Sequence, residues 1–395
     1  MKESSIPSTG EPQQGKQISI NAPRRSFLAH FQRWEWMLVA LVLAAIVINS
    51  RLTPYFLNAQ NLSRTSAGFM ELGLMMLPMV FIIITGNIDL SVASNLGMCA
   101  SLMAVLWNLH VNIWVAAAAG LALGTLAGAL NGFLIAKIKL PALVATLGTY
   151  AFYRGIAYVL LGDQAGRGYP PAFTYLGQGM VPGTLIPFSV ALFFVLAVVF
   201  GLVLHRTTFG RYIYAIGNNE NASIYAGVPV ARNKLIIYTV SGFMAALAGL
   251  VLAARFGSTR PDIGTGLELS VITAAVLGGV DINGGSGTMV GAVLSLVLIG
   301  LVTFGMGLKN VQDQVQTIAI GSLLILSILI ASIARTISAG GAKLNRRTFA
   351  LAAVFILIFA AFFFFFYWSR APVLNRFLAR RAYLKRVTTG VCLLT

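Results

Sequence analysis

The side chains that could carry out catalysis are few in this chain and lie far apart. Its histidines are His30, His110 and His205, and its cysteines are Cys99 and Cys392. Neither set has the spacing of a metal site or of a disulfide framework. The sequence shows no paired carboxylates and no nucleophile elbow of the kinds that acid–base or acyl-transfer enzymes use. We therefore expect neither an enzyme nor a metal centre.

One segment near the N-terminus comes close to a phosphate-binding loop. Residues 10–17 read GEPQQGKQ and contain the one Gly-Lys pair of the chain. However, Gln17 stands where Ser or Thr would bind magnesium, and the pattern shows no strand before the segment and no helix after it. If ATP drives this protein, we expect ATP and magnesium on a separate ATPase chain and no cofactor on this one.

The composition indicates that most of the chain is surrounded by lipid rather than by water. Hydrophobic residues make up 57% of the chain and charged residues 10%, whereas a soluble domain carries about 25% charged residues. Mean hydropathy is +0.83. The 28 basic residues outnumber the 11 acidic ones. They lie mainly between apolar runs, which indicates positive-inside topology in a lipid bilayer rather than a nucleic-acid partner.

The apolar runs predict an all-α fold, a polytopic membrane helix bundle. A helix needs roughly 20 apolar residues to cross the hydrocarbon core, and the chain offers about ten such spans. They cover residues 36–56, 67–86, 92–107, 113–136, 142–161, 185–204, 236–254, 269–280, 288–308 and 315–334. The third is short. The eighth is too short to span alone, so we expect a half-helix, a re-entrant segment or a span extended by its glycine-rich flanks.

Three parts follow from this pattern. Residues 1–35 are polar and predict a disordered cytoplasmic leader, and residues 36–335 predict a transmembrane domain. Residues 336–395 contain a basic linker, an extra hydrophobic segment at 349–368 and a basic tail. A crossing at 349–368 would place the basic tail outside the cell. Therefore either that segment lies in the interface, or the topology is frustrated there, or the tail is an appendage of no functional consequence.

Basic residues set the expected orientation. They gather in the leader and in the segments 137–139, 205–235 and 335–347. All of these fall on the cytoplasmic side if the N-terminus is cytoplasmic, as the positive-inside rule requires.

Four polar residues lie where a solute could pass through the bundle. Asn87 and Asp89 end the second span, Asn131 lies in the fourth, and Asn283 lies in a glycine-rich turn. We take them as candidates for a substrate pathway. The alternative is that Asp89 caps a helix and that Asn131 makes an interhelical hydrogen bond.

Two short segments of the chain also resemble each other. Residues 86–91 read GNIDLS and residues 278–283 read GGVDIN. This similarity indicates either an internal repeat, with a site at the repeat interface, or two similar turns in which an aspartate caps the next helix.

Glu71 and Arg154 are charged residues within the predicted second and fifth spans, and Arg51 interrupts the first. By the crossing count, Glu71 lies roughly 6 Å and Arg154 roughly 10 Å below the outer ends of their helices. A charge in a span usually finds a partner, so we expect these two to form an intramembrane ion pair. The alternative is that Arg154 snorkels outward and Glu71 ends in water.

Glycines recur every four residues in the fourth span. The set is Gly120, Gly124, Gly128 and Gly132. Four glycines on one helical face predict close packing against another backbone.

The cytoplasmic loop between the sixth and seventh spans is the most informative stretch. Residues 209–228 read FGRYIYAIGNNENASIYAGV. Two helical stretches separated by Gly-Asn-Asn predict a short helix-turn-helix under the membrane. The stretch resembles the ATPase-docking loop of the sugar permeases of ATP-binding-cassette importers. Within the branched-chain amino acid/sugar permease family, it is most similar to the ribose/rhamnose/autoinducer-2 branch.

Further motifs fit the same family in the same order. They are TGNIDLSV at 85–92, TLGT at 146–149, YRGIA at 153–157, and VLGGV at 276–280 with NGGSGT at 283–288. The resemblance covers about residues 34–333 and leaves out 345–395.

The resemblance implies roles for particular residues. The ATPase-coupling set would be Gly210, Arg211, Tyr214, Ala215, Gly217, Asn218, Asn219, Ala222, Tyr225 and Gly227. In such a loop, Gly210 and Gly217 would allow close backbone approach to a groove on the ATPase, and Tyr214 and Tyr225 would act as anchors. Arg255 and Arg260, outside by the crossing count, would orient a binding protein with acidic rims.

The resemblance also implies partners and a substrate class. The partners would be cassette ATPase subunits, a second permease subunit of the same or a homologous chain, and a periplasmic sugar-binding protein, all at the bacterial inner membrane. The stretches RWEW at 33–36, LGDQA at 161–165 and GSTRP at 257–261 look most like rhamnose permeases. Rhamnose is thus the leading substrate, with ribose, autoinducer-2 or another sugar as alternatives. An ion-coupled secondary transporter is a more remote alternative, because it needs an ion-binding group near the midplane.

Overall fold

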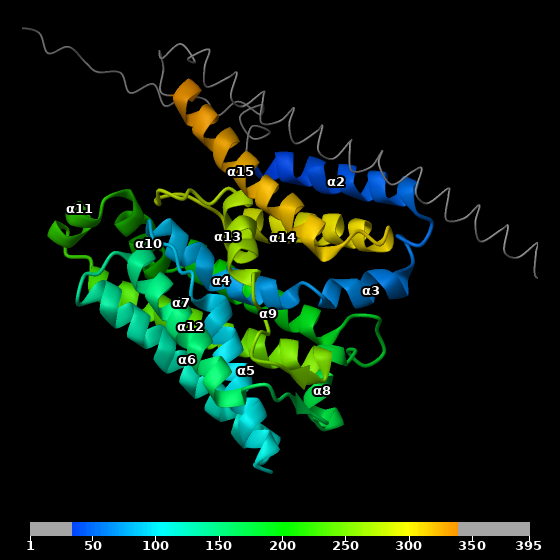
Figure 1. Ribbon diagram of the computed structural model, residues 1–395. Helices are drawn as coiled ribbons and strands as arrows, with labels where there is room; N and C mark the ends of the chain where they lie inside the picture. Colours follow the sequence, from blue (N-terminus) through cyan, green and yellow to red (C-terminus); the bar gives the residue numbers. More distant parts are fainter. Residues whose placement is uncertain (1–33, 339–395) are drawn as a thin grey trace, which may run out of the picture.

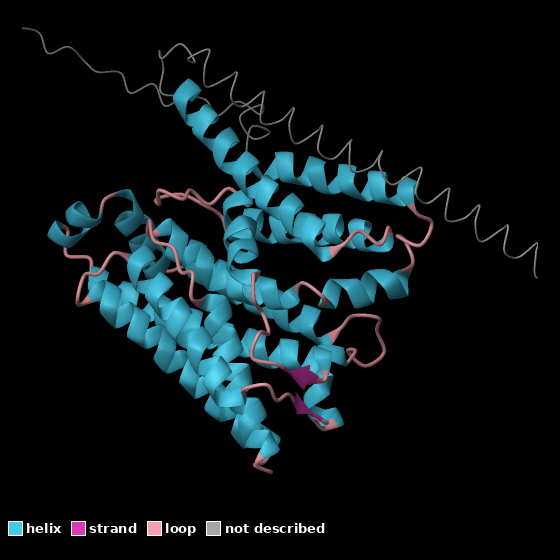
Figure 2. Cartoon of the chain, in the orientation of Figure 1, coloured by secondary structure: helices cyan, strands magenta, loops and turns pink. Residues whose placement is uncertain are grey.

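The structure, a computed structural model, describes residues 34–338. Within that range the chain is helical apart from two short strands and the connecting loops (Figure 2). Several predicted features lie outside the described residues. They are the leader apart from its last two residues, with His30 and the segment 10–17 that is similar to a phosphate-binding loop, the extra hydrophobic segment 349–368 and the basic tail.

The elements follow one another along the chain as a series of helices. The first half contains α2 (Trp34–Leu52), α3 (Ala59–Ala67), α4 (Met70–Ile84), α5 (Val92–Asn108), α6 (Ile113–Ala136), α7 (Ala142–Leu161), β1 (Gly166–Arg167), α8 (Pro171–Gln178) and α9 (Phe188–Arg206). The second half contains α10 (Thr208–Asn218), α11 (Glu220–Tyr225), α12 (Val230–Phe256), β2 (Ser258–Thr259), α13 (Leu267–Leu277), α14 (Met289–Leu308) and α15 (Asp313–Ser338). The strands pair antiparallel, with Gly166 opposite Thr259.

The predicted apolar runs up to residue 334 all fall on helices. In the described part of the chain, six helices are long and apolar enough to cross a membrane, and seven if α3 and α4, bent by 50°, form one broken span. The runs 92–107 and 269–280 correspond to the shorter apolar helices α5 and α13. The fold is therefore the polytopic helical membrane bundle that the composition predicts.

Helix α4 forms the centre of the bundle. Every residue of Met70–Ile84 is buried, and α9, α12, α13 and α14 pack around it. A helix that is apolar on all sides is stable only when other helices surround it. Pro78 lies inside α4, where it removes one backbone hydrogen bond and favours a local bend.

The glycine face of α6 packs against α12 and α5. A Cβ atom at Gly128 would overlap the Tyr238 carbonyl of α12, and one at Gly124 would lie 2.9 Å from the Gly242 carbonyl. Gly120 faces Cys99 of α5, and Gly132 faces Leu235. The absence of side chains on this face lets the two backbones approach closely.

The outer helices expose large apolar side chains. Leu126 of α6 is 68% exposed, Val159 of α7 is 87% exposed and Val195 of α9 is 63% exposed. Such faces suit lipid as the surrounding medium.

The bundle has two distinct ends, which lie at the left and right of Figure 1. Helices α10 and α11 and the loop 278–288 lie at one end, whereas α3, α8 and the strands lie at the other. The basic residues Lys137, Lys139, Arg232 and Lys234 lie at the end with α10 and α11.

Candidate coupling site

The helix-turn-helix at residues 208–225 is built by local capping. The Thr207 side chain accepts a hydrogen bond from Gly210 N and begins α10. Asn219 ends α10 and begins α11, where its Oδ1 accepts from Ala222 N at 2.9 Å. Ser, Thr and Asn at these positions satisfy backbone N–H groups that a helix start leaves unpaired. The Gly-Asn-Asn sequence thus forms the break between the two helices.

Helix α10 presents one face to the bundle. Gly210, Ile213 and Ile216 are buried on this face. A Cβ atom at Gly210 would overlap the Leu204 carbonyl at the end of α9. Gly210 therefore permits a sharp turn from the membrane helix into α10 rather than an approach to a partner.

Gly217 lies at a junction of three chain segments. A Cβ atom there would overlap the Ile84 carbonyl at the end of α4 and lie 2.5 Å from Gly285 N. Gly285 N itself donates to Ile84 O at 2.8 Å. The end of α10, the end of α4 and the loop after α13 are thus in direct backbone contact. The close backbone approach at Gly217 is therefore a contact within this chain, whereas the sequence predicted an approach to a groove on the ATPase.

Tyr214 points into the same junction. Its hydroxyl donates to Gly287 O at 2.7 Å, and its ring lies 6.5 Å from the His205 ring between centroids. Burial raises the pKa of Tyr214, so the phenol keeps the proton that it donates. Tyr214 therefore holds α10 to the loop 281–287, and the sequence had suggested instead an anchor for a partner.

The opposite face of the helix pair points away from the bundle. Tyr225 is 92% exposed, and Arg211, Asn218, Asn219, Ala222 and Gly227 are exposed as well, while Ala215 is half-buried. A large exposed aromatic side chain on such a face suits a protein partner.

An ion pair holds α11 against the start of α12. Lys234 Nζ lies 2.7 Å from Glu220 Oε2, and the Lys234 side chain is only 8% exposed. Sequence reasoning missed this pair, although both residues lie within the predicted loop 205–235. The ion pair connects α11 to the long helix α12.

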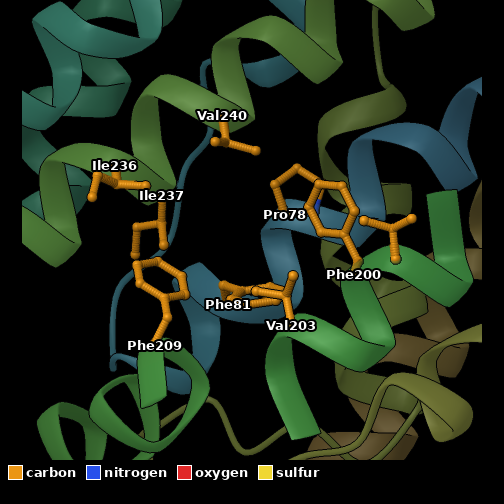
Figure 3. Close-up of a pocket in the computed structure, with 9 residues that line it drawn as sticks. Pro78, Phe81, Phe200, Val203, Phe209, Ile236, Ile237 and Val240 are labelled. Atoms are coloured by element: carbon orange, nitrogen blue, oxygen red, sulfur yellow. The ribbon is translucent and has the colours of Figure 1, made fainter. Parts of the chain in front are cut away.

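An apolar cavity lies beneath the start of α10. Its volume is about 300 Å³, and Figure 3 shows Pro78 and Phe81 of α4, Phe200 and Val203 of α9, and Phe209 of α10 around it. Ile236, Ile237 and Val240 of α12 close the other side. The Phe209 ring lies 6.2 Å from the Phe81 ring. The cavity leaves room for Phe209 to move relative to α4.

The two similar segments, residues 86–91 and 278–283, form the same turn and meet at one end. Asp89 Oδ1 accepts from Ser91 N at 2.9 Å, and Asp281 Oδ1 accepts from Asn283 N at 2.9 Å. Both are turns in which an aspartate bonds the backbone two residues on. A Cβ atom at Gly86 would lie 3.4 Å from Asn283 O. The segments therefore share local geometry and lie side by side.

Asp89 and Asn131 belong to a buried hydrogen-bond network. Asn131 Nδ2 donates to Ser91 Oγ at 2.8 Å, and Ser91 Oγ donates to Asp89 Oδ1 at 2.6 Å. Asp89 is 3% exposed and Asn131 is 1% exposed. Their hydrogen bonds join α6 to the start of α5, which is the interhelical alternative rather than the wall of an open route.

Asn87 and Asn283 lie nearer to water. Asn283 is exposed. Asn87 lines a cavity of about 720 Å³ that the segment 135–142, α11 and the start of α12 also form. The basic side chains of Lys137, Lys139, Arg232 and Lys234 border this cavity. Of the four pathway candidates, Asn87 is half-buried and Asn283 is exposed, whereas Asp89 and Asn131 are buried.

The predicted pair between Glu71 and Arg154 is wrong. Glu71 Oε1 accepts from Arg255 Nε at 2.7 Å, and Glu71 is 2% exposed. The crossing count gave depth in the membrane but not which helices are neighbours. Helix α12, which carries Arg255, packs directly on α4, whereas α7, which carries Arg154, packs on α5.

Arg154 has backbone partners instead. Its Nη1 donates to Pro261 O at 2.9 Å and Ile263 O at 3.1 Å, and its Nη2 donates to Ala93 O at 3.2 Å. Arg154 thus ties the loop after β2 to α5. Of the two expected docking arginines, Arg255 turns inward, and Arg260 is exposed and lies 3.2 Å from Asp262.

Comparison with known proteins gives the class of protein to which this bundle belongs. The family described as branched-chain amino acid transport system, permease component, matches residues 61–333. These residues include α4, α10, α11 and the glycine-rich loop 278–288. No solved structure matches the chain.

Curated relatives give the same answer over most of the chain. The autoinducer 2 import system permease protein LsrD of Photorhabdus temperata is 35% identical over 306 residues, which cover 76% of this chain and 91% of that protein. The proteins of the same name from Klebsiella pneumoniae and Escherichia coli K12 are each 34% identical over 302 residues, 75% of this chain.

The fold and these matches define a multi-pass membrane permease, which is a transport subunit and not an enzyme. The chain belongs to the family of permease components of branched-chain amino acid transport systems.

Proposed function

We propose that this chain is the membrane-spanning subunit of an ATP-driven importer of a sugar-like solute in the bacterial inner membrane, with its N-terminus in the cytoplasm. The observation that carries the proposal is the α10–α11 pair. Its inner face contacts the end of α4 and the loop 281–287, and its outer face exposes Tyr225. A partner that moves this pair would move the central helix with it.

The proposed assembly has the usual parts of such an importer. Two ATPase chains bind ATP and magnesium and dock on α10 and α11. A second permease subunit, identical or homologous, completes the pathway, and a periplasmic binding protein delivers the solute. Arg260 is the exposed arginine that would contact acidic groups of that protein.

Autoinducer 2 replaces rhamnose as the leading solute. The relatives at 34–35% identity carry the name of autoinducer 2 import permeases, and rhamnose has no such support. Ribose and other sugars stay as alternatives, because the binding protein selects the solute before the permease meets it. Uptake of autoinducer 2, ribose and rhamnose by the reconstituted importer, each with saturating binding protein, ranks them.

Docking of the ATPase is tested by co-purification. In Tyr225→Ala, loss of the exposed anchor should lower the amount of ATPase that co-purifies with the permease at least about fivefold, the effect of losing roughly 1 kcal/mol of binding. The matched control is Tyr55→Ala, since Tyr55 is 67% exposed between α2 and α3 at the other end of the bundle. Equal ATPase recovery with wild type and Tyr225→Ala would reject docking at this surface.

A further inference from the structure

A second polar site lies at the outer end of the bundle. A cavity of about 780 Å³ opens there between α3, α4, α12, α13, α14 and α15. Its volume is within the range of small-molecule sites, about 300–1,000 Å³. It lies beneath the surface that carries Arg260, because Arg255 at the end of α12 lines it.

The ion pair of Glu71 and Arg255 forms the floor of this cavity. The pair uses one carboxylate oxygen and the guanidinium Nε, which meet at 2.7 Å. A carboxylate has a second oxygen, and a guanidinium has two further NH₂ groups. The Arg255 side chain is 26% exposed, so these groups can reach a molecule in the cavity. The pair presents both donors and acceptors without a net charge of its own, and Asp313 at the start of α15 adds a carboxylate to the lining.

The walls combine hydroxyl groups with aromatic rings. The hydroxyl residues are Thr65, Thr265, Ser270 and Thr303. The rings are those of Phe69, Phe256 and Phe304. Hydroxyl and charged groups can bond to the hydroxyls of a sugar, while aromatic surfaces contact its C–H groups. The cavity at Phe209, by contrast, is lined by hydrophobic residues alone.

Arg154 supports one wall of the cavity. It holds the carbonyls of Pro261 and Ile263, and the next residues, Gly264 and Thr265, line the cavity. Arg154 is therefore a positioning residue for this wall and does not line the cavity itself.

We propose that the cavity is an outer binding site for the uncharged, polyhydroxylated solute, which it receives from the binding protein before translocation. This inference rests on the proposed function. It assigns the Glu71–Arg255 pair a role in contact with the solute in addition to its role in packing.

The first test is protection of a cysteine from a water-soluble thiol reagent. Ser270→Cys is made in a Cys392→Ser background, since Cys99 is buried. The importer is reconstituted with its ATPase and with binding protein that is either empty or loaded with autoinducer 2, ribose or rhamnose. The empty and loaded binding proteins cover the same surface, so a difference between them reports the solute. We expect loading to slow labelling of the Ser270→Cys variant at least about fivefold, because a bound solute would cover the thiol.

The second test removes one hydroxyl group with a matched control. Thr303→Val should raise the half-saturating concentration of the loaded binding protein roughly three- to tenfold, the effect of one lost hydrogen bond. Thr239→Val is the control, because both threonines donate to the carbonyl four residues earlier at 2.8 Å and Thr239 does not line the cavity.

The outcomes separate this inference from the proposed function. Normal uptake with labelling that is equal for empty and loaded binding protein, and with equal half-saturation for both valine variants, would overturn the binding site alone. Failure of wild type to co-purify with the ATPase, together with failure to take up any of the three solutes, would overturn the proposed function and this inference with it.

Discussion

At the scale of single residues, the Glu71–Arg255 pair shows how burial fixes a partner. Glu71 is 2% exposed, and a buried carboxylate is tolerated only when an opposite charge and hydrogen bonds compensate for lost water. Arg255 supplies both at 2.7 Å and stacks over the Phe256 ring at 4.6 Å. The pair therefore holds the outer ends of α4 and α12 together.

Breaking this pair should cost stability. Arg255→Ala leaves the Glu71 carboxylate buried without its counter-charge, so we expect a loss of about 3 kcal/mol or more in the free energy of unfolding. The measurement is thermal or denaturant unfolding in detergent. Exchange of the two charges, Glu71→Arg with Arg255→Glu, should recover part of the loss.

Arg260→Ala is the matched control for this change. Arg260 is 72% exposed and its partner Asp262 is 48% exposed, so water screens the pair and its loss should cost less than about 1 kcal/mol. Equal stabilities of the Arg255 and Arg260 variants would show that the buried pair does not support the bundle.

The sequence could indicate that Glu71 needs a partner but not which one. Its depth follows from counting residues along a helix, whereas its neighbour depends on which helices pack together. The same limit applies to Gly217 and Tyr214. Their types suggested close approach and anchoring, but only the fold shows that both contacts lie within the chain.

At the scale of elements, the crossing of α6 and α12 shows the clearest link from sequence to packing. The four-residue spacing of the glycines was sufficient to predict a close helix contact. The sequence could not give the partner helix. In the structure Gly128 of α6 lies against Gly242 of α12, with Gly128 N 2.7 Å from where a Gly242 Cβ would be.

Adding one methyl group at this crossing should destabilise the bundle. We expect Gly128→Ala to lower the free energy of unfolding by about 1–3 kcal/mol, because its Cβ would overlap the Tyr238 carbonyl. Gly155→Ala in α7 is the control, since nothing lies within 4 Å of its Cβ position. There the alanine should be neutral or stabilising by up to about 1 kcal/mol. Unfolding curves that coincide for both variants would contradict the packing account.

Most elements of the described chain could be predicted from hydropathy. The apolar runs up to residue 334 coincide with helices, and the shortness of the eighth run corresponds to α13 with only 11 residues. The helix-turn-helix followed from its break at Gly217, Asn218 and Asn219. Pairing of Lys234 with Glu220 could not be predicted, because the positions of two charges in the sequence do not show how α11 packs on α12.

At the scale of the whole molecule, the α10–α11 pair is in contact with the central helix α4. Three segments that are far apart in the sequence meet at Gly217, where α10 contacts Ile84 and Gly285. Helix α4 runs from this junction to the outer cavity, where Glu71 in its first turn lies. A movement of α10 and α11 can therefore be transmitted through the packed helix α4 to the proposed outer site.

Gly217→Ala tests this link most directly. Alanine normally favours a helix over glycine by about 0.5–1 kcal/mol, so any loss must come from overlap of the new Cβ with the Ile84 carbonyl and Gly285 N. The measurement is solute uptake and ATP hydrolysis in the same proteoliposomes, with Gly155→Ala as the matched control. The account predicts that Gly217→Ala still assembles and hydrolyses ATP but takes up at least about tenfold less solute per ATP. Uptake per ATP equal to that of wild type and of Gly155→Ala would contradict it.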